Sequence, residues 1–362
     1  MSATVRTRAT VRTAPTAATA PTALMAAMAA MGPTRRRLAG PPEPRVESHE
    51  IISGTEILLR TTTECNQRCH FCFLPPVRRS FAWEDILGAL REVARRPQPP
   101  KILTLSGGEP TADSRLPRIL TAARRLGIRR FVLQTNAVRL SDASLLGRLN
   151  RLGVEGYVVS FHSHKPARYD EITRSRGQYS RAVAGIRRLI RGRCRLTINV
   201  VVNARNYEDL PELVAFLARQ GAGKNRAKEL DVYFSMINEA GHQLAPDWAV
   251  GLERVSAPLR RALEVCDQAG IRVAKFVGGS CFPVCLTAHP ERYACERALS
   301  QERVRYAVAF SGASGAIGRA KHPDCRDCAY DSRCLGVPAS YATHYGVAAL
   351  RVVKMSPLCA TT

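Results

Sequence analysis

From Ile51 onward, short apolar segments alternate with amphipathic ones, and this alternation restricts the fold more than any other feature of the sequence. Between Phe81 and Arg96 apolar residues recur at helical spacing, which predicts a helix with one buried face. Strands are expected at residues 57–63, 102–105, 131–133, 157–160, 196–202 and 230–234, and helices at 119–126, 143–152, 182–190 and 210–218. Six strands alternating with helices predict an α/β fold of parallel βα units, a partial (β/α)6 barrel of the TIM type.

Three cysteines directly follow the first expected strand. They lie at C-x3-C-x2-C spacing in the run Cys65-Asn66-Gln67-Arg68-Cys69-His70-Phe71-Cys72. So short a loop can bring three thiolates to three corners of a 4Fe-4S cluster, which leaves the fourth iron without a protein ligand. A zinc site that lacks its fourth ligand and unrelated buried cysteines are the other interpretations.

A second motif, Ser106-Gly107-Gly108-Glu109-Pro110-Thr111, follows the strand expected at 102–105. Paired glycines at a strand end let backbone approach a ligand, because no Cβ stands in the way. The Glu109 carboxylate is an acceptor that can bind an ammonium group. Since reactive residues of (β/α) barrels lie at the carboxyl ends of strands, both motifs are placed where chemistry is expected.

Together the two motifs resemble those of the radical S-adenosylmethionine (SAM) superfamily, and the resemblance runs from about Thr55 to Tyr345. It implies that Cys65, Cys69 and Cys72 bind the SAM-associated cluster. The SAM contacts it implies are Phe71 on the adenine, Gly107, Gly108 and Glu109 on the methionyl amino group, and Gln134 and Asn136. Ser160, Arg174 and Asn203 are further implied contacts, which fit ordinary polar strand ends or loops equally well.

The C-terminal part is rich in cysteine, and Cys325, Cys328 and Cys334 follow a C-x2-C-x5-C pattern. This pattern resembles the auxiliary-cluster extensions of radical SAM enzymes known as SPASM and its shorter form, Twitch. Pro338 stands where the full SPASM pattern has a further cysteine, which favours Twitch. The implied ligands of a second 4Fe-4S cluster are Cys285, Cys325, Cys328 and Cys334, with Cys281 as a possible substitute for Cys285. A structural zinc site is the alternative.

We therefore expect three parts: a low-complexity tail at residues 1–50, a barrel at 51–275 and a small cysteine-rich extension at 276–362. The twelve cysteines cluster at ligand spacings, which indicates metal binding in a reducing, cytoplasmic compartment. No stretch approaches the roughly 20 apolar residues of a membrane span. The formal charge of +24 would attract RNA or an acidic partner, although the arginines are scattered over expected helix faces.

The resemblance implies an enzyme that reductively cleaves SAM to a 5′-deoxyadenosyl radical, with a flavodoxin or ferredoxin as electron donor. The radical would take hydrogen from a peptide or a small biosynthetic intermediate, for oxidation, crosslinking or epimerisation. Candidate catalytic groups are Cys281 or Cys295 as a hydrogen-atom donor and His162 as an acid or base. The rival functions are RNA modification and a non-catalytic iron-sulfur or zinc protein.

Overall fold

The computed structural model describes residues 48–51, 56–72, 74, 78–95, 102–223, 230–237, 246–276, 280–295, 308–310, 313–315 and 319–354. Residues 44–362 form one compact unit. The expected tail lies outside the described residues except for its last positions, which belong to β1 (Ser48–Ile51). This strand, which the sequence pattern does not predict, pairs antiparallel with β2 (Glu56–Thr62).

The predicted α/β barrel fold is confirmed. Within the described residues the main sheet has the order β1-β2-β3-β4-β5-β6-β7-β8, and every pair from β2–β3 to β7–β8 is parallel. The remaining strands of this sheet are β3 (Ile102–Gly107), β4 (Phe131–Thr135), β5 (Val154–Ser160), β6 (Arg195–Val202), β7 (Leu230–Met236) and β8 (Arg272–Val273). Strand order thus follows chain order, as it does when each βα unit adds the next strand to a curved sheet.

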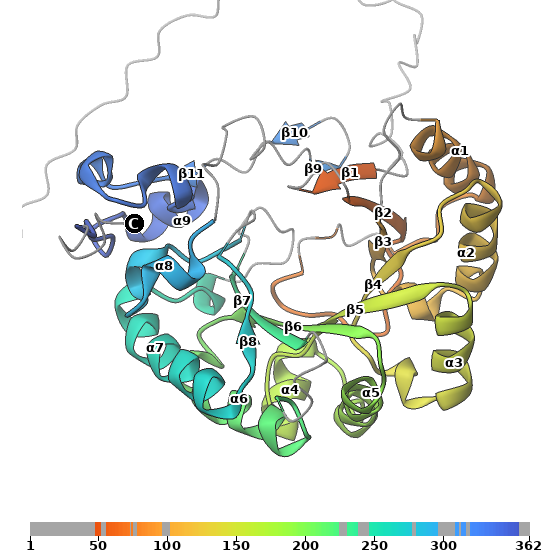
Figure 1. Ribbon diagram of the computed structural model, residues 1–362, viewed down its shortest axis with the longest axis horizontal. Coiled ribbons are helices and arrows are strands. Elements are labelled where there is room, and N and C mark those ends of the chain that lie inside the picture. The colour runs from red at the N-terminus through yellow and green to blue at the C-terminus, as the bar shows by residue number, and fades with distance from the viewer. Residues whose placement is uncertain are drawn as a thin grey trace, which may run out of the picture. The chain divides into compact units, whose positions relative to one another are not determined.

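Helices separate the parallel strands and cover the outer face of the sheet (Figure 1). They are α1 (Trp83–Ala94), α2 (Leu116–Arg125), α3 (Ala143–Arg151), α4 (Pro166–Thr173), α5 (Tyr179–Arg191), α6 (Leu210–Arg219) and α7 (Leu252–Ala269). In α1 the predicted apolar stripe is buried, since Ile86, Leu90 and Val93 are fully covered.

Strand β6 shows how the two faces of the sheet differ. Leu196, Ile198, Val200 and Val202 alternate along it and are buried, whereas the residues between them are half-buried. Alternate side chains of a strand point to opposite faces, so the apolar set packs under the helices and the other set, with Asn199, faces the interior of the barrel. Ser160 on β5 pairs in register with Asn199 and shares this polar inner face.

The described residues of the C-terminal part form short elements only. They are η5 (Val284–Leu286), α8 (Pro290–Tyr293), β9 (Val308–Phe310), β10 (Ala313–Gly315), β11 (Arg319–Ala320), η7 (Pro323–Asp327), η8 (Asp331–Arg333), β12 (Val337–Pro338) and α9 (Ala339–Tyr345). Hydrogen bonds attach this part to the barrel: the Leu252 N–H donates to Tyr341 Oη at 2.8 Å, and Arg260 Nε donates to the Leu286 carbonyl at 2.7 Å. Cys281 forms a β-bridge with Ser235 in β7.

Candidate active site

The three motif cysteines lie on the loop after β2, at the carboxyl end of the sheet. Cys65, Cys69 and Cys72 are half-buried. The loop rests on the end of α4, because the N–H groups of Arg68 and His70 donate to carbonyls of that helix at 2.9 and 3.2 Å. Its position is therefore set by the barrel as well as by its own sequence.

The cysteine thiols interact electrostatically with one another. Burial raises the pKa of Cys65 to about 12 and raises the pKa values of Cys69 and Cys72 as well. The neighbouring thiols add to the shift at Cys69, whereas Arg78 opposes it. Metal ligands must be thiolates, so the positive charge of bound iron would stabilise the form that burial disfavours. The donor set and its crowding fit an iron-sulfur cluster.

Gly107 and Gly108 bring the second motif into backbone contact with the cysteine loop. A Cβ on Gly108 would lie 1.9 Å from the Glu64 carbonyl oxygen, and one on Gly107 would lie 2.1 Å from the Thr62 oxygen. Gly107 also has φ +128°, a conformation that side chains disfavour. The N–H groups of Gly108 and Glu109 donate to the carbonyls of Thr62 and Glu64, both at 2.7 Å. The paired glycines are therefore required for this close contact as well as suited to approaching a ligand.

The Glu109 carboxylate is buried and joins the ends of β3 and β4. Its Oε1 accepts from Thr111 N–H at 3.0 Å, Thr111 Oγ1 at 2.6 Å and Thr135 Oγ1 at 2.7 Å. Its Oε2 accepts from the Asn136 N–H at 2.6 Å. Burial raises the Glu109 pKa, and these hydrogen bonds oppose the rise. The carboxylate thus holds two strand ends together in addition to any contact it makes with a ligand.

Asn136 and Gln134 also connect segments at this end of the barrel. Asn136 Nδ2 donates to Asn66 Oδ1 in the cysteine loop at 2.7 Å. Gln134 Oε1 accepts from Ser106 Oγ at 2.6 Å, which joins β4 to β3. Asn66 was not identified from the sequence as a site residue, although its place between two of the motif cysteines is the signal that could have found it.

Aromatic side chains pack beside the cysteine loop. Phe71 lies edge-on to His162 with ring centroids 4.8 Å apart, and His70 stacks on Trp248 at 4.2 Å. His162 is buried, and its Nδ1 accepts the Val201 N–H at 3.2 Å. Burial lowers the His162 pKa to about 3, so this imidazole is neutral and serves as packing surface and acceptor in this structure. Trp248 carried no signal in the sequence, because it lies far along the chain from the motif.

The remaining implied SAM contacts lie in different surroundings. Ser160 is half-buried at the end of β5, on the inner face. Arg174 is exposed, has φ +47° and ends α4 beside the loop, where its charge adds to the lowering of the His70 pKa that burial causes. Asn203 is fully buried, and its amide donates to the Val201 carbonyl while its oxygen accepts the Arg205 N–H. The Asn203 side chain thus braces its own loop.

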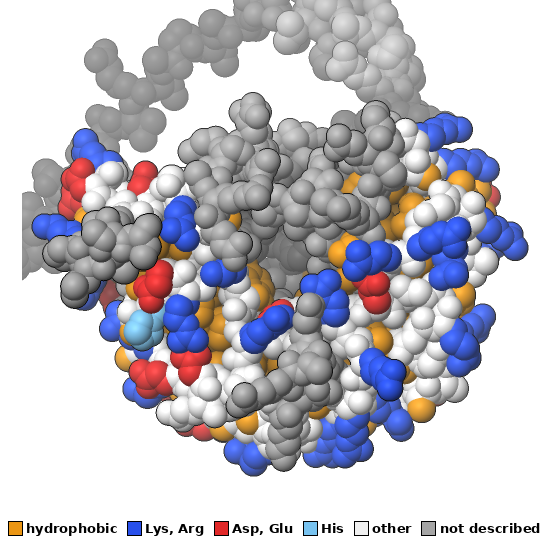
Figure 2. Space-filling view, in the orientation of Figure 1, with side chains coloured by type: hydrophobic (Ala, Val, Ile, Leu, Met, Phe, Trp, Pro, Cys, Tyr) orange, Lys and Arg blue, Asp and Glu red, His pale blue; other side chains and the backbone are white. Residues whose placement is uncertain are grey.

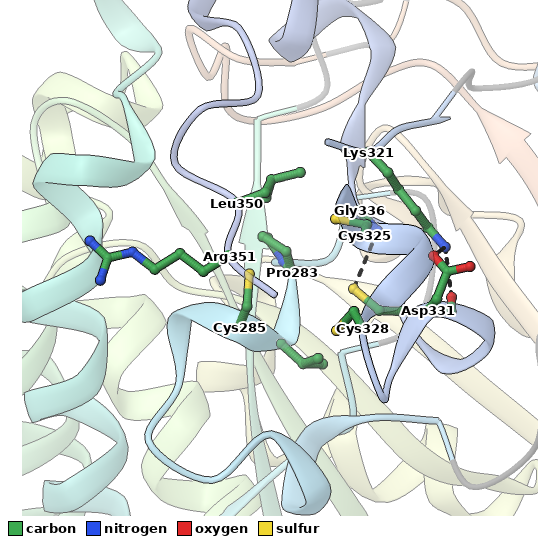
Figure 3. Close-up of a pocket in the computed structure, with 11 residues that line it drawn as sticks. Pro283, Cys285, Lys321, Cys325, Cys328, Asp331, Gly336, Leu350 and Arg351 are labelled. Carbon is green, nitrogen blue, oxygen red and sulfur yellow. Dashed lines mark hydrogen bonds and ion pairs between the residues drawn. The ribbon is translucent and has the colours of Figure 1, made fainter. Parts of the chain in front are cut away.

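A second group of cysteines lines a cavity in the C-terminal part (Figure 3). Cys285, Cys325, Cys328 and Cys334, the predicted ligands of a second cluster, all line it, together with Lys321, Asp331 and Leu350. Burial and the other three thiols raise the Cys285 pKa to about 11. The structure brings together four cysteines that are up to 49 positions apart, from Cys285 to Cys334. This donor set fits an iron-sulfur cluster.

Cys281 and Cys295 do not line this cavity. Cys281 is fully buried beside it and its Sγ accepts from Arg319 Nη2 at 3.3 Å, while burial raises its pKa to about 11. The Cys295 backbone pairs with Arg333. Cys285 rather than Cys281 is therefore the fourth cysteine of the group.

Among the described residues, no three His, Cys, Asp or Glu side chains are arranged to hold one metal ion. The cysteines of a cubane cluster each bind a different iron, so they are spaced more widely than the ligands of a single ion. No helix within the described ranges is long and apolar enough to cross a membrane.

Comparison with known proteins agrees with this geometry. The family model described as "Radical SAM superfamily" matches residues 59–217. The chain is 28% identical over 177 residues to the PqqA peptide cyclase of Gluconobacter oxydans, covering 46% of this chain and 47% of that one. It is 27% identical over 164 residues to a probable GTP 3′,8-cyclase of Sulfolobus acidocaldarius, covering 44% and 51%. This chain thus spans about half of the length of these relatives.

Solved structures share the fold. The Streptococcus suis protein SuiB bound to precursor peptide SuiA superposes with a TM-score of 0.51 at 19% identity, over 70% of this chain and 56% of SuiB. SuiB bound to SAM gives a TM-score of 0.50 at 18% identity over the same shares. Together with the cysteine loop and the Gly-Gly-Glu segment at the carboxyl end of a parallel barrel sheet, the family match shows that residues 59–217 belong to the radical SAM superfamily.

Proposed function

We propose that this enzyme binds a 4Fe-4S cluster through Cys65, Cys69 and Cys72 and binds SAM beside it. The observation that carries the proposal is the contact between the cysteine loop and the Gly107–Glu109 segment, made by two backbone hydrogen bonds of 2.7 Å. When bound, the cluster and SAM supply one-electron cleavage of SAM and hydrogen-atom abstraction from a substrate carbon. The chain itself positions the loop and excludes water from the buried polar groups beneath it.

The remaining SAM contacts follow from position. Gln134 and Ser160 lie on the inner face of the barrel, near the strand ends that carry the two motifs. Phe71 presents a half-buried ring beside the third cysteine, where it is placed to cover an adenine. Glu109 and Asn136 hold β3, β4 and the cysteine loop in register.

We further propose that Cys285, Cys325, Cys328 and Cys334 hold a second 4Fe-4S cluster. Four cysteines would leave no iron open, so this cluster would pass electrons rather than bind substrate. The proposed substrate is a peptide or a small biosynthetic intermediate, and the product is oxidised, crosslinked or epimerised. Similarity to a protein named as a peptide cyclase supports a peptide as the substrate. An acidic flavodoxin or ferredoxin suits the basic surface as electron donor.

RNA modification is the second candidate, because of the charge of +24. Figure 2 shows Lys and Arg side chains spread over the visible face rather than gathered in one patch. Several are paired on the surface, as Arg130 is with Glu155 and Arg292 with Asp267. RNA modification would be supported if binding to tRNA weakened more steeply with added salt than it does for other basic proteins.

The central proposal is tested on anaerobically reconstituted protein. We expect about eight irons per chain, four for each cluster, and 5′-deoxyadenosine formation on adding dithionite and SAM. Cys69→Ala should abolish 5′-deoxyadenosine and remove about half of the iron. Cys194→Ala is the matched control, since that cysteine comes immediately before β6 and lies outside both groups. Zinc in place of iron, or full activity in the Cys69 variant, would refute the proposal.

A further inference from the structure

The segment Leu350–Lys354, here called the C-terminal strap, crosses the cavity of the second cysteine group. Leu350 and Arg351 line the cavity, and Leu350 is buried (Figure 3). The Val353 N–H donates to Cys328 Sγ at 3.4 Å, and the Val353 carbonyl accepts the Ala329 N–H at 2.9 Å. The N–H and the carbonyl of Val353 therefore both bind the strap to the end of the Cys325–Cys328 turn.

Backbone N–H groups face three of the four sulfurs. Besides Val353 on Cys328, the backbone N–H of Arg351 donates to Cys285, where it opposes the rise in pKa that burial causes at that thiol. Gly336 N–H donates to Cys334 Sγ at 3.4 Å. The Arg351 side chain is exposed and points away from the cysteines in Figure 3, so this residue acts on the group through its backbone.

Hydrogen bonds to cluster sulfurs change the energy of the two redox states by different amounts. The positive end of an N–H dipole faces the sulfur, and a reduced cluster carries one more negative charge than the oxidised one. Hydrogen bonds to charged acceptors are stronger, so each N–H stabilises the reduced state more. More such bonds raise the reduction potential, which is one of the ways in which proteins tune these clusters.

We propose that the C-terminal strap raises the reduction potential of the second cluster through the N–H groups of Arg351 and Val353. The inference rests on the proposed function, in which Cys285, Cys325, Cys328 and Cys334 hold that cluster. The strap makes the cluster a better electron acceptor than the same four cysteines would make alone. It also connects the end of the described chain to the electron-transfer properties of the enzyme.

The test uses full-length chain carrying Cys65→Ala, Cys69→Ala and Cys72→Ala, so that only the second cluster is loaded. Val353→Pro and Arg351→Pro each delete one donor, whereas Val353→Ala and Arg351→Ala keep the N–H and are the matched controls. The potential is measured by redox titration followed by electron paramagnetic resonance. We expect each proline variant to shift the one-electron equilibrium about tenfold toward the oxidised state, or about 59 mV, and the alanine variants to match the parent.

A second measurement does not depend on how proline is tolerated. Chain labelled with 15N-valine should show a hyperfine coupling from the Val353 nitrogen in the reduced cluster, and Val353→Ala should remove it. Proline and alanine variants with equal potentials, or a parent spectrum without that coupling, would overturn the strap inference alone. If the triple-alanine parent binds no iron, the proposal of a second cluster is itself refuted, and the strap inference loses its basis.

Discussion

Gly108→Ala should detach the cysteine loop from the rest of the site. The new Cβ would lie 1.9 Å from the Glu64 carbonyl oxygen, and neither atom can rotate away, because the backbone fixes the Cβ position and the oxygen is itself a backbone atom. Relief requires a shift of more than 1 Å, because real Cβ atoms essentially never approach another heavy atom more closely than 3.0 Å. That shift breaks the two 2.7 Å backbone hydrogen bonds between the segments.

The magnitude follows from those losses. Two backbone hydrogen bonds contribute about 1 kcal/mol each, and residual overpacking adds about 1–3 kcal/mol. We therefore expect the variant to be destabilised by about 3–5 kcal/mol, concentrated at this end of the barrel. A displacement of about 1 Å at a reacting centre can cost about 100-fold in rate. The iron of the first cluster should fall and 5′-deoxyadenosine formation should drop by about that factor.

Gly88→Ala is the matched control. Gly88 lies in α1, where an added Cβ would have nothing within 4 Å. Alanine there should raise stability by up to about 1 kcal/mol, because glycine is unfavourable inside helices. Iron content, urea unfolding and 5′-deoxyadenosine are measured on both variants. A Gly108 variant with parental iron and parental turnover would refute the reasoning.

Three further changes test other parts of the site. In Glu109→Gln an amide N–H would face the Asn136 N–H, which now donates to Oε2 at 2.6 Å. The free energy of unfolding in urea should fall by about 1–3 kcal/mol, and an unchanged urea midpoint would contradict this. Because the His162 pKa is lowered to about 3, the unfolded chain binds this proton before the folded chain does, and the free energy of unfolding falls as pH drops below 6.5. His162→Asn should remove about 2 kcal/mol of the stability that the parent loses between pH 7 and 5. Equal pH profiles for the free energy of unfolding of parent and variant would count against this. Cys285→Ala should lose the iron of the second cluster, whereas Cys281→Ala should keep it. The reverse result would assign the fourth ligand to Cys281 instead of Cys285.

Much of the barrel follows from local pattern. In strand β6 the apolar Leu196 and Ile198 alternate with the polar Thr197 and Asn199, and helix α1 carries its apolar stripe at helical spacing, so both elements can be predicted without any tertiary information. Strand β1 cannot be predicted in this way, because its four residues show no clear alternation and form a strand only by pairing with the edge of β2. Helix and strand ends also differ from the prediction by a few residues, since capping depends on neighbours.

The sequence by itself predicted the chemistry that we propose for both sites. Cysteine spacing predicted three ligands on one loop, and the C-x2-C-x5-C run predicted most of the second cysteine group, because residue type and loop length are local properties. Tertiary structure decided the rest. Cys285 rather than Cys281 faces the second cavity, His162 is buried and neutral, and Gly108 is needed by the neighbouring loop. These outcomes depend on which backbone passes within a few ångströms of a side chain, and residues distant in sequence determine that only once the chain has folded.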